Sequence, residues 1–402
     1  MSNLRKNLAQ VVLLGVVAPG GAGAGCDGRG GGATASATTS TGTNMATGAG
    51  TSTAAAVTTT TAGPASPGAT VLRRGTGFGA RMGRMFEDYG MALVFAGICI
   101  LFTIWTKGLF IRPDNIVNVL RQISINACIA TGMTFVIITG GVDLSVGSVL
   151  AVVGIVTAKL LTRLPGVVGV PLAIIASCVV GLMIGGAMGA VNGFTITRFR
   201  VPPFVSTLAM MTAARGIAFL LSDGRPVWNL PLQFNFIGRG YVLDKLFGPW
   251  IPMPVVIMVV VMAIAHVILT RTQIGRYVYA VGGNEEAARL SGINVARVKM
   301  FTYSLSGVTS ALGGIILISR LASGQPGAGE SYELYAIAAT VLGGTSMSGG
   351  KGTMVGTAIG ALIMGVLNNG LNLAGVESYS QNVVLGAVIL GAVLIDRLRK
   401  GA

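Results

Sequence analysis

Long apolar runs separated by short polar segments constrain this 402-residue chain more than any other feature. A helix needs roughly 20 apolar residues to cross the hydrocarbon core of a bilayer. The crossings at 333–346 and 382–396 are short, so we expect them to be half-helices or to depend on neighbouring helices. The sequence predicts about ten crossings in all, at residues 90–106, 116–139, 144–161, 167–194, 202–221, 251–270, 300–319, 333–346, 353–371 and 382–396.

Charged residues make up only 10% of the chain, whereas 52% of it is hydrophobic. A soluble domain usually carries about 25% charged residues. A chain with so little charge cannot cover a water-facing surface, so its outer surface must face lipid. We therefore predict an all-α integral membrane protein embedded in a lipid bilayer.

The formal net charge of +15 could suggest a nucleic-acid partner. The basic residues, however, are scattered between the apolar runs and form no stripe, so we predict no nucleic-acid partner. Cytoplasmic loops of membrane proteins are rich in Lys and Arg. Placing both termini in the cytoplasm puts most of the basic loop residues there, including those of the longest cytoplasmic loop, about 271–299. We therefore expect both termini to be cytoplasmic.

The first part of the chain differs in composition from the rest. Residues 20–70 are rich in Gly, Ala, Ser and Thr, and such a segment cannot bury enough apolar area to offset its ordering entropy. We predict a disordered N-terminal extension over 1–84 and a transmembrane domain over 85–400. A short apolar run, Val11–Ala18, precedes Cys26 and leaves a processed signal sequence as the alternative.

Metal binding and catalysis lack the residues that they need. The four cysteines, at positions 26, 99, 128 and 178, have no metal-ligand spacing, and the single histidine, His266, lies in an apolar run. An intramembrane enzyme would need a nucleophile with a base, or a metal cluster. We find neither pattern, so we expect no catalytic residue, no metal and no cofactor bound by this chain.

Glycines recur at four-residue spacing in two sets, one inside the predicted crossing 167–194 and one at the start of 353–371. Small residues at this spacing let helix backbones approach closely in lipid, so we expect tight helix packing there and no ligand role. The two sets are Gly181, Gly185 and Gly189, and Gly352, Gly356 and Gly360.

One segment of the 271–299 loop stands apart from the rest of the chain. Glu285, Glu286 and Arg289 suit an exposed short helix, and Gly292 suits its C-terminal stop. The segment reads Glu286-Ala287-Ala288, three further residues, and then Gly292. A solvated surface helix would explain this pattern by itself, because the motif is short and common.

Further motifs make the pattern specific, because they occur in a fixed order along residues 85–399. With them, the membrane domain resembles the ribose-type monosaccharide permeases of ABC importers. The matching segments are Gly140–Ser148, Gly275–Tyr277, Gly282–Glu285, Leu290–Val295, Ala336–Ser346, Gly349–Gly352 and Leu367–Asn372.

The resemblance implies a permease subunit of the cell inner membrane, working as a homodimer. It implies a separate cytoplasmic ABC ATPase that uses ATP, and a periplasmic or lipid-anchored sugar-binding protein that confers selectivity. It also implies that the short helix docks in a groove of the ATPase. The coupling residues would then be Glu285, Glu286, Ala287, Ala288 and Gly292.

Two other transport hypotheses stay open. The same fold could carry a nucleoside or a branched-chain amino acid. An ion-coupled secondary transporter would need intramembrane carboxylates or histidine relays. Asp143 and His266 lie in different segments, and no other carboxylate falls well inside a predicted crossing.

Residues 345–352 nearly form a phosphate-binding loop. Thr345 stands where that motif needs a Gly, and Gly352 stands where it needs a Ser or Thr. We also expect no strand before it. We therefore predict no nucleotide binding at Lys351, and the source of ATP hydrolysis must be another chain.

Asp143 lies between two predicted crossings and beside several glycines. A carboxylate at membrane depth must pair or face water. Asp143, Ser145 and Ser148 could cap the next helix, and the alternatives for Asp143 are contact with solute, a gate or contact with the ATPase.

Other polar residues within the crossings are candidates for the solute path, although interhelical hydrogen bonding would explain each one singly. Together with Asp143 and Ser145, the candidates are Arg121, Gln122, Asn126, Asn192, Arg215, Asn368, Asn369 and Asn372.

Overall fold

A computed structural model describes residues 78–242 and 250–401 of the chain. These residues belong to one compact unit. Most of the segment predicted to be a disordered extension, residues 1–77, lies outside the described part. The first described helix begins at Phe78, inside the range that the sequence assigns to the extension.

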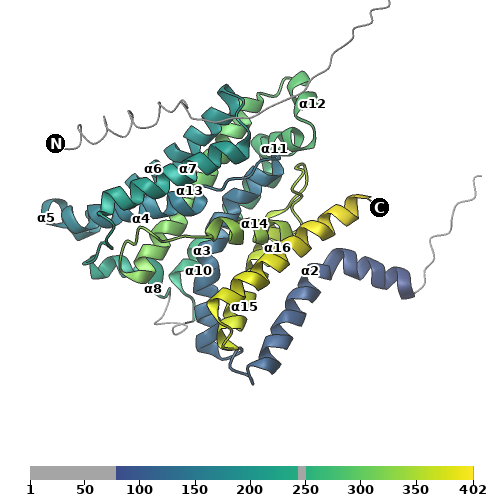
Figure 1. Ribbon diagram of the computed structural model, residues 1–402, viewed down its shortest axis with the longest axis horizontal. Helices are drawn as coiled ribbons and strands as arrows, with labels where there is room; N and C mark the ends of the chain where they lie inside the picture. Colours follow the sequence, from purple (N-terminus) through teal and green to yellow (C-terminus); the bar gives the residue numbers. More distant parts are fainter. Residues whose placement is uncertain (1–77, 243–249, 402) are drawn as a thin grey trace, which may run out of the picture. The chain divides into compact units, whose positions relative to one another are not determined.

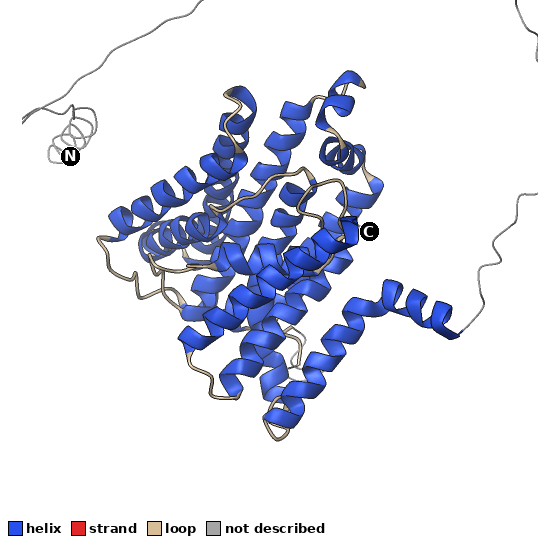
Figure 2. Cartoon of the chain, turned by 45° about the vertical axis from the view of Figure 1, so that its right-hand side comes forward, coloured by secondary structure: helices blue, strands red, loops and turns tan. Residues whose placement is uncertain are grey.

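The described part of the chain is helical, and no strand occurs in it (Figures 1 and 2). The all-α prediction is therefore confirmed for these residues. The helices are α2 (Phe78–Trp105), α3 (Pro113–Ile138), α4 (Val146–Arg163), α5 (Pro165–Val168), α6 (Val170–Arg198), α7 (Pro203–Ser222), η1 (Leu232–Asn235), α8 (Phe236–Arg239), α10 (Met253–Arg271), α11 (Gln273–Gly283), α12 (Glu285–Leu290), α13 (Val295–Leu321), α14 (Tyr332–Leu342), α15 (Met354–Leu373) and α16 (Ser378–Gly401).

Seven of these helices are long and apolar enough to cross a membrane, namely α3, α4, α6, α7, α10, α13 and α15. Each of the other three predicted crossings also falls on a helix. The apolar part of α2 is limited to Met91–Trp105, and α14 has only 11 residues. Helix α14 is therefore too short to cross a bilayer by itself, as expected for 333–346, whereas 382–396 lies within α16, a helix of 24 residues.

Helix α13 lies at the centre of the bundle and packs against α6, α3 and α4. Its apolar window is 72% buried, whereas that of α6 is only 22% buried, so most of the surface of α6 faces outward. Glycines bring α6 and α13 together, because Gly185 meets the Gly307 backbone and Gly189 meets the Tyr303 carbonyl. This contact confirms the predicted role of the glycine spacing in α6.

The second glycine set also packs helices. Gly356 lies against Gly343, and Gly360 lies against the Ala339 carbonyl, so α15 approaches α14 closely. Before α14, residues 322–331 form an irregular segment that re-enters the bundle along α4. Its Gly324 exchanges two backbone hydrogen bonds with Val227, and its Gly329 packs on Gly147 near the start of α4.

Candidate coupling surface and polar pathway residues

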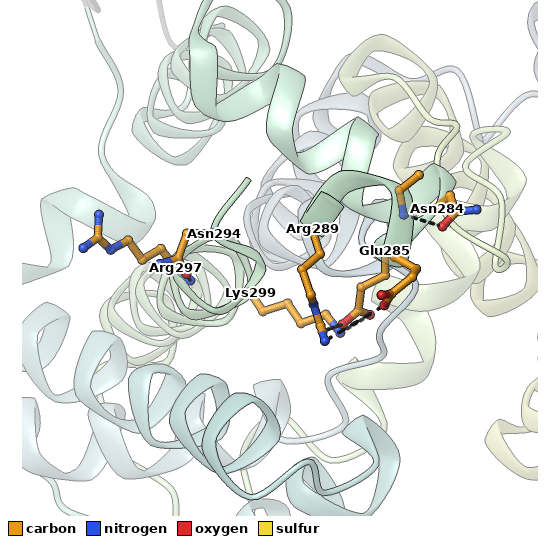
Figure 3. Close-up of polar contacts among 8 residues, drawn as sticks. Asn284, Glu285, Arg289, Asn294, Arg297 and Lys299 are labelled. Atoms are coloured by element: carbon orange, nitrogen blue, oxygen red, sulfur yellow. Dashed lines mark hydrogen bonds and ion pairs between the residues drawn. The ribbon is translucent and has the colours of Figure 1, made fainter. Parts of the chain in front are cut away.

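The loop that the sequence singles out forms two short helices, α11 and α12, before α13. Each of the three helices begins at a side-chain cap. The oxygen of Thr272 accepts from the Gly275 amide at 3.2 Å. Asn284 Oδ1 accepts from the Ala287 amide at 2.9 Å, and Asn294 Oδ1 accepts from the Arg297 amide at 3.0 Å (Figure 3). Local sequence therefore determines where these helices start.

Glu285 is the electrostatic centre of this loop (Figure 3). Its Oε2 lies 2.6 Å from Lys299 Nζ, and its Oε1 lies 3.3 Å from Arg289 Nη2. Arg289 also approaches Glu286 Oε2 at 4.0 Å. Within the described ranges 78–242 and 250–401, every ion pair lies here. Glu285 therefore ties α12 to the first turns of α13, while Glu286 projects into solvent.

Helix α12 stops at Gly292, as the sequence predicts. Gly292 has φ +83°, a left-handed conformation that glycine adopts without steric cost. The amides of Gly292 and Ile293 donate to the carbonyls of Arg289 and Ala288. Ala288 is buried against the core, whereas Leu290 is 82% exposed. Helix α12 is therefore fixed to the core on one side and exposed on the other.

A pocket lies on each side of α12–α13. One, of about 580 Å³, is bounded by residues of the α6–α7 connection and by Glu285, Arg289 and Lys299. The other, of about 440 Å³, is bounded by α11 residues and by Gly292 and Arg297. The α12–α13 connection, whose Ile293 and Asn294 line both hollows, separates them, and α12 projects beside this connection as a ridge.

Near this ridge, the connection between α14 and α15 contacts both the end of α3 and helix α11. The Gly350 amide donates to the Ile138 carbonyl at 2.8 Å, and the Tyr279 hydroxyl donates to the Gly352 carbonyl at 2.6 Å. Burial raises the pKa of Tyr279, which keeps this donor protonated. Residues 345–352, which nearly form a phosphate-binding loop in the sequence, follow helix α14. Through these two hydrogen bonds their backbone links α3 to α11.

Asp143 lies deep in the bundle, with only 1% of its surface exposed. Its Oδ1 accepts from the Ser145 amide at 3.0 Å and from the Ser145 hydroxyl at 2.6 Å, and its Oδ2 accepts from Ser306 Oγ at 2.7 Å. Asn192 Nδ2 donates to Ser145 Oγ at 3.0 Å. Asp143, Ser145 and Asn192 are therefore brought together, with Ser306 of α13.

The helix-capping role expected for Asp143 and Ser145 is wrong. Ser145 is the N-cap of α4, yet no side chain accepts a hydrogen bond from the first amides of that helix. Asp143 instead bonds to the residue two positions on, which is a local turn. Sequence analysis also missed Ser306, because a serine inside an apolar helix carries no signal of a partner 163 positions away.

A second group of the predicted pathway residues joins α3 to α15. Gln122 Nε2 donates to Asn368 Oδ1 at 2.9 Å, and Asn115 and Asn369 exchange two hydrogen bonds of 3.0 Å. Asn372 Nδ2 donates to Asn368 Oδ1 at 3.4 Å. The bonds of Gln122 with Asn368 and of Asn115 with Asn369 are interhelical, the alternative that the sequence left open for each candidate, whereas the Asn372 bond lies within α15.

The remaining candidates lie apart from one another. Arg121 donates to the Arg239 carbonyl at 2.8 Å and stacks over Tyr241, with its guanidinium 4.6 Å from the ring centroid. The Asn126 side-chain oxygen is buried and has no hydrogen-bond partner. Arg215 of α7 donates to two carbonyls of the re-entrant segment. The structure therefore does not gather the predicted pathway residues into one site.

A second carboxylate, Glu333, lies beside the start of α4. Residues 322–331 turn back into the bundle, so Glu333, in the first turn of α14, lies beside Gly147 of α4. Glu333 is the first residue of the predicted crossing 333–346, a position that the sequence alone would assign to the membrane surface. Only the course of the preceding segment carries it inward.

Comparison with known proteins identifies similar chains along most of the described part. Residues 115–393 match the family model described as the branched-chain amino acid transport system permease component. The chain is 53% identical over 290 residues to the ribose import permease protein of Bacillus subtilis (strain 168). The aligned region covers 72% of this chain and 86% of that protein. No solved structure matches the chain.

Two relatives from Escherichia coli (strain K12) extend the comparison. The ribose import permease protein is 48% identical over 296 residues, covering 72% of this chain and 88% of the relative. The D-allose transport system permease protein is 38% identical over 314 residues, covering 78% of this chain and 92% of the relative.

Proposed function

The chain belongs to the family described as the branched-chain amino acid transport system permease component, and we propose that it forms the membrane passage of an ATP-driven monosaccharide importer. Its location is the cell inner membrane. The single observation that carries the choice of solute is the identity of 48–53% to ribose import permeases over most of their length. The D-allose permease is more distant, so a ribose-like pentose is the proposed cargo.

The ridge formed by α12 supports coupling to a partner ATPase. Its start is fixed by Asn284 and its end by Gly292, and Glu285 anchors it to α13 through Lys299. A rigid, exposed ridge can transmit a displacement of its partner to α13, the central helix of the bundle. In this proposal ATP is bound and hydrolysed by the partner, and this chain binds no cofactor.

The proposed arrangement has ten crossings and both termini in the cytoplasm. Helices α2, α14 and α16 complete the set with the seven long apolar helices. The hydrogen bonds that join Ile138 to Gly350 and Tyr279 to Gly352 support the alternation of these crossings, because it assigns all four residues to the same side of the membrane. Reporter fusions at residues 285 and 400 test it, and periplasmic reporter activity from either fusion would refute it.

The other proposed partners are a second copy of the permease and a periplasmic or lipid-anchored sugar-binding protein. A branched-chain amino acid is the alternative cargo, because the description of the matching family names it. Uptake of radiolabelled ribose and leucine, each competed by an excess of the other, separates the two possibilities. Uptake of leucine that ribose does not inhibit would favour the amino acid.

The test of coupling uses cells that express the chain with its ATPase and binding protein. Ribose uptake should require an ATPase able to hydrolyse ATP and should resist a protonophore. We expect Glu286→Lys to lower uptake about tenfold or more, because a like charge or lost contact in an interface costs several kcal/mol. The amount of permease in the membrane should stay unchanged.

The matched control is Glu377→Lys, which makes the same charge reversal at an exposed residue between α15 and α16. It should leave uptake unaltered. Normal uptake by Glu286→Lys, together with co-purification of the ATPase at the wild-type level, would overturn the coupling role of the ridge. Uptake that persists without the ATPase and collapses with a protonophore would instead indicate an ion-coupled carrier.

A further inference from the structure

Arg215, Glu330 and Glu333 form a charged cluster that none of the assigned roles explains. Arg215 belongs to α7, Glu330 to the re-entrant segment and Glu333 to the first turn of α14. Glu330 is exposed, and the other two side chains are half-buried. Arg215 donates to two carbonyls of the segment that contains Glu330 and leads into Glu333, yet among the described residues neither carboxylate lies within ion-pair distance of it.

The depth of Glu333 follows from its neighbours. A methyl group placed on Gly147 would lie 2.6 Å from Glu333 Oε2. Gly147 lies between two residues that contact α13. Before it, Asp143 bonds to Ser306. After it, the Leu150 carbonyl packs on Gly314. At 1.5 Å per residue, Ser306 is about 16 Å from the first residue of α13 and Gly314 is about 10 Å from the last. Glu333 therefore lies well inside the bilayer.

Arg215 lies at a similar depth. Helix α7 runs from Pro203 to Ser222, so Arg215 is about 18 Å from its start and about 10 Å from its end. Charged side chains cannot face hydrocarbon at this depth without a cost of several kcal/mol. Because all three are at least partly open, the surface that they share must face water or protein.

The backbone holds the guanidinium in place. Arg215 Nη1 donates to the Ala328 carbonyl at 2.7 Å and to the Pro326 carbonyl at 3.0 Å. The Nη2 and Nε groups have no hydrogen-bond partner among the described residues. The guanidinium is thus held against the segment that carries Glu330 and leads into Glu333, with donors left over that no described acceptor takes.

This combination suits a sugar. A sugar hydroxyl donates one hydrogen bond and accepts others, so a guanidinium and a carboxylate can hold the same hydroxyl from two sides. We propose that Arg215, Glu330 and Glu333 form a hydroxyl-binding station on the translocation path, through which the monosaccharide passes near the midplane. This inference rests on the proposed function, because it needs a solute rich in hydroxyl groups.

The first test measures ribose uptake by the complete transporter. We expect Glu333→Gln and Arg215→Gln each to lower uptake about tenfold, because each weakens a charge-assisted hydrogen bond to the solute. Glu333→Asp keeps the carboxylate and should retain at least half of the uptake. The matched controls are Glu377→Gln and Arg225→Gln, which change exposed charges outside the cluster and should transport normally.

The second test measures access of water to the cluster. In a variant with its native cysteines replaced by serine, Glu333→Cys should react with a membrane-impermeant thiol reagent, and excess ribose should slow the reaction. Met183→Cys is the control, because Met183 is exposed on an apolar part of α6 that we expect to face lipid. It should remain unreactive.

The outcomes separate the station from other roles of this surface. Failure of Glu333→Cys to react, or its spontaneous disulfide bonding to a second copy, would place the cluster in a contact between copies and overturn the station. Wild-type uptake by Glu333→Gln and Arg215→Gln would overturn it as well. If the unsubstituted transporter imports no sugar at all, the proposed function itself fails.

Discussion

Glu285 and Asp143 are two carboxylates treated in opposite ways by the same fold. The Glu285 side chain is 42% exposed and is neutralised by Lys299 and Arg289. Asp143 is 1% exposed and accepts hydrogen bonds from the hydroxyls of Ser145 and Ser306 and from the Ser145 amide, with no cation among these described partners. The surface carboxylate is paired by charge, whereas the buried one is held by hydrogen bonds alone.

The two carboxylates are positioned by different kinds of contact, local for Glu285 and long-range for Asp143. Glu285 and Arg289 are four residues apart on one helix, so the spacing of the sequence brings them together. Asp143 meets Ser306 of α13, and the Ser145 that it holds meets Asn192 of α6. A change at Asp143 should therefore disturb three segments at once, while a change at the ridge should stay local.

The largest effect is expected at Asp143. Asp143→Leu leaves the hydroxyls of Ser145 and Ser306 and one buried amide without an acceptor, at about 1–3 kcal/mol for each group that finds no other partner. We expect the thermal midpoint of the purified permease to fall by several degrees. Asp143→Asn, which keeps the shape and one oxygen, should change the free energy of unfolding by about 1 kcal/mol or less. Equal midpoints for the two variants would remove the contrast with Glu285.

A smaller and local effect is expected at Gly292. An alanine there must adopt φ near +83°, which costs roughly 1–2 kcal/mol for a residue with a Cβ. No other atom lies close to the position, so the strain is confined to the backbone. Hydrogen exchange of the α12 amides should become about fivefold faster, while exchange in α13 stays unchanged. Gly292→Asn, which tolerates this conformation better, is the control.

The smallest effect is expected at Lys299. Lys299→Met removes the 2.6 Å ion pair with Glu285. Because Glu285 is partly exposed, the pair should contribute no more than about 1 kcal/mol. A double-mutant cycle with Glu285→Gln measures this coupling, which should shrink further as salt rises. A Lys299–Glu285 coupling energy larger than the stability lost in Asp143→Leu would reverse the comparison between the two regions.

Much of the fold could be predicted because lipid leaves few choices. An apolar run in a bilayer must satisfy its backbone internally, so it forms a helix. Each of the ten predicted crossings falls on a helix, and the predicted turn at Gly292 is present. These features depend on residues within one or two helical turns of each other.

The polar interior could not be predicted in the same way. The sequence names Gln122 and Asn368 as pathway candidates, yet it does not say that they bond to each other across 246 positions. It also places Glu333 near the end of a crossing, although the re-entrant segment before α14 carries that residue to Gly147. Such partners are set by which helices become neighbours.

The sequence by itself determined the membrane class, the helical elements and the capped ridge over Glu285–Leu290, because apolar length and local capping act over short distances. Tertiary structure alone decided that Asp143 is held by Ser306 and that Arg215 is held by the carbonyls of Pro326 and Ala328. The physical reason is that a buried polar group takes its partner from whichever helix packs against it, and that packing is a property of the whole bundle.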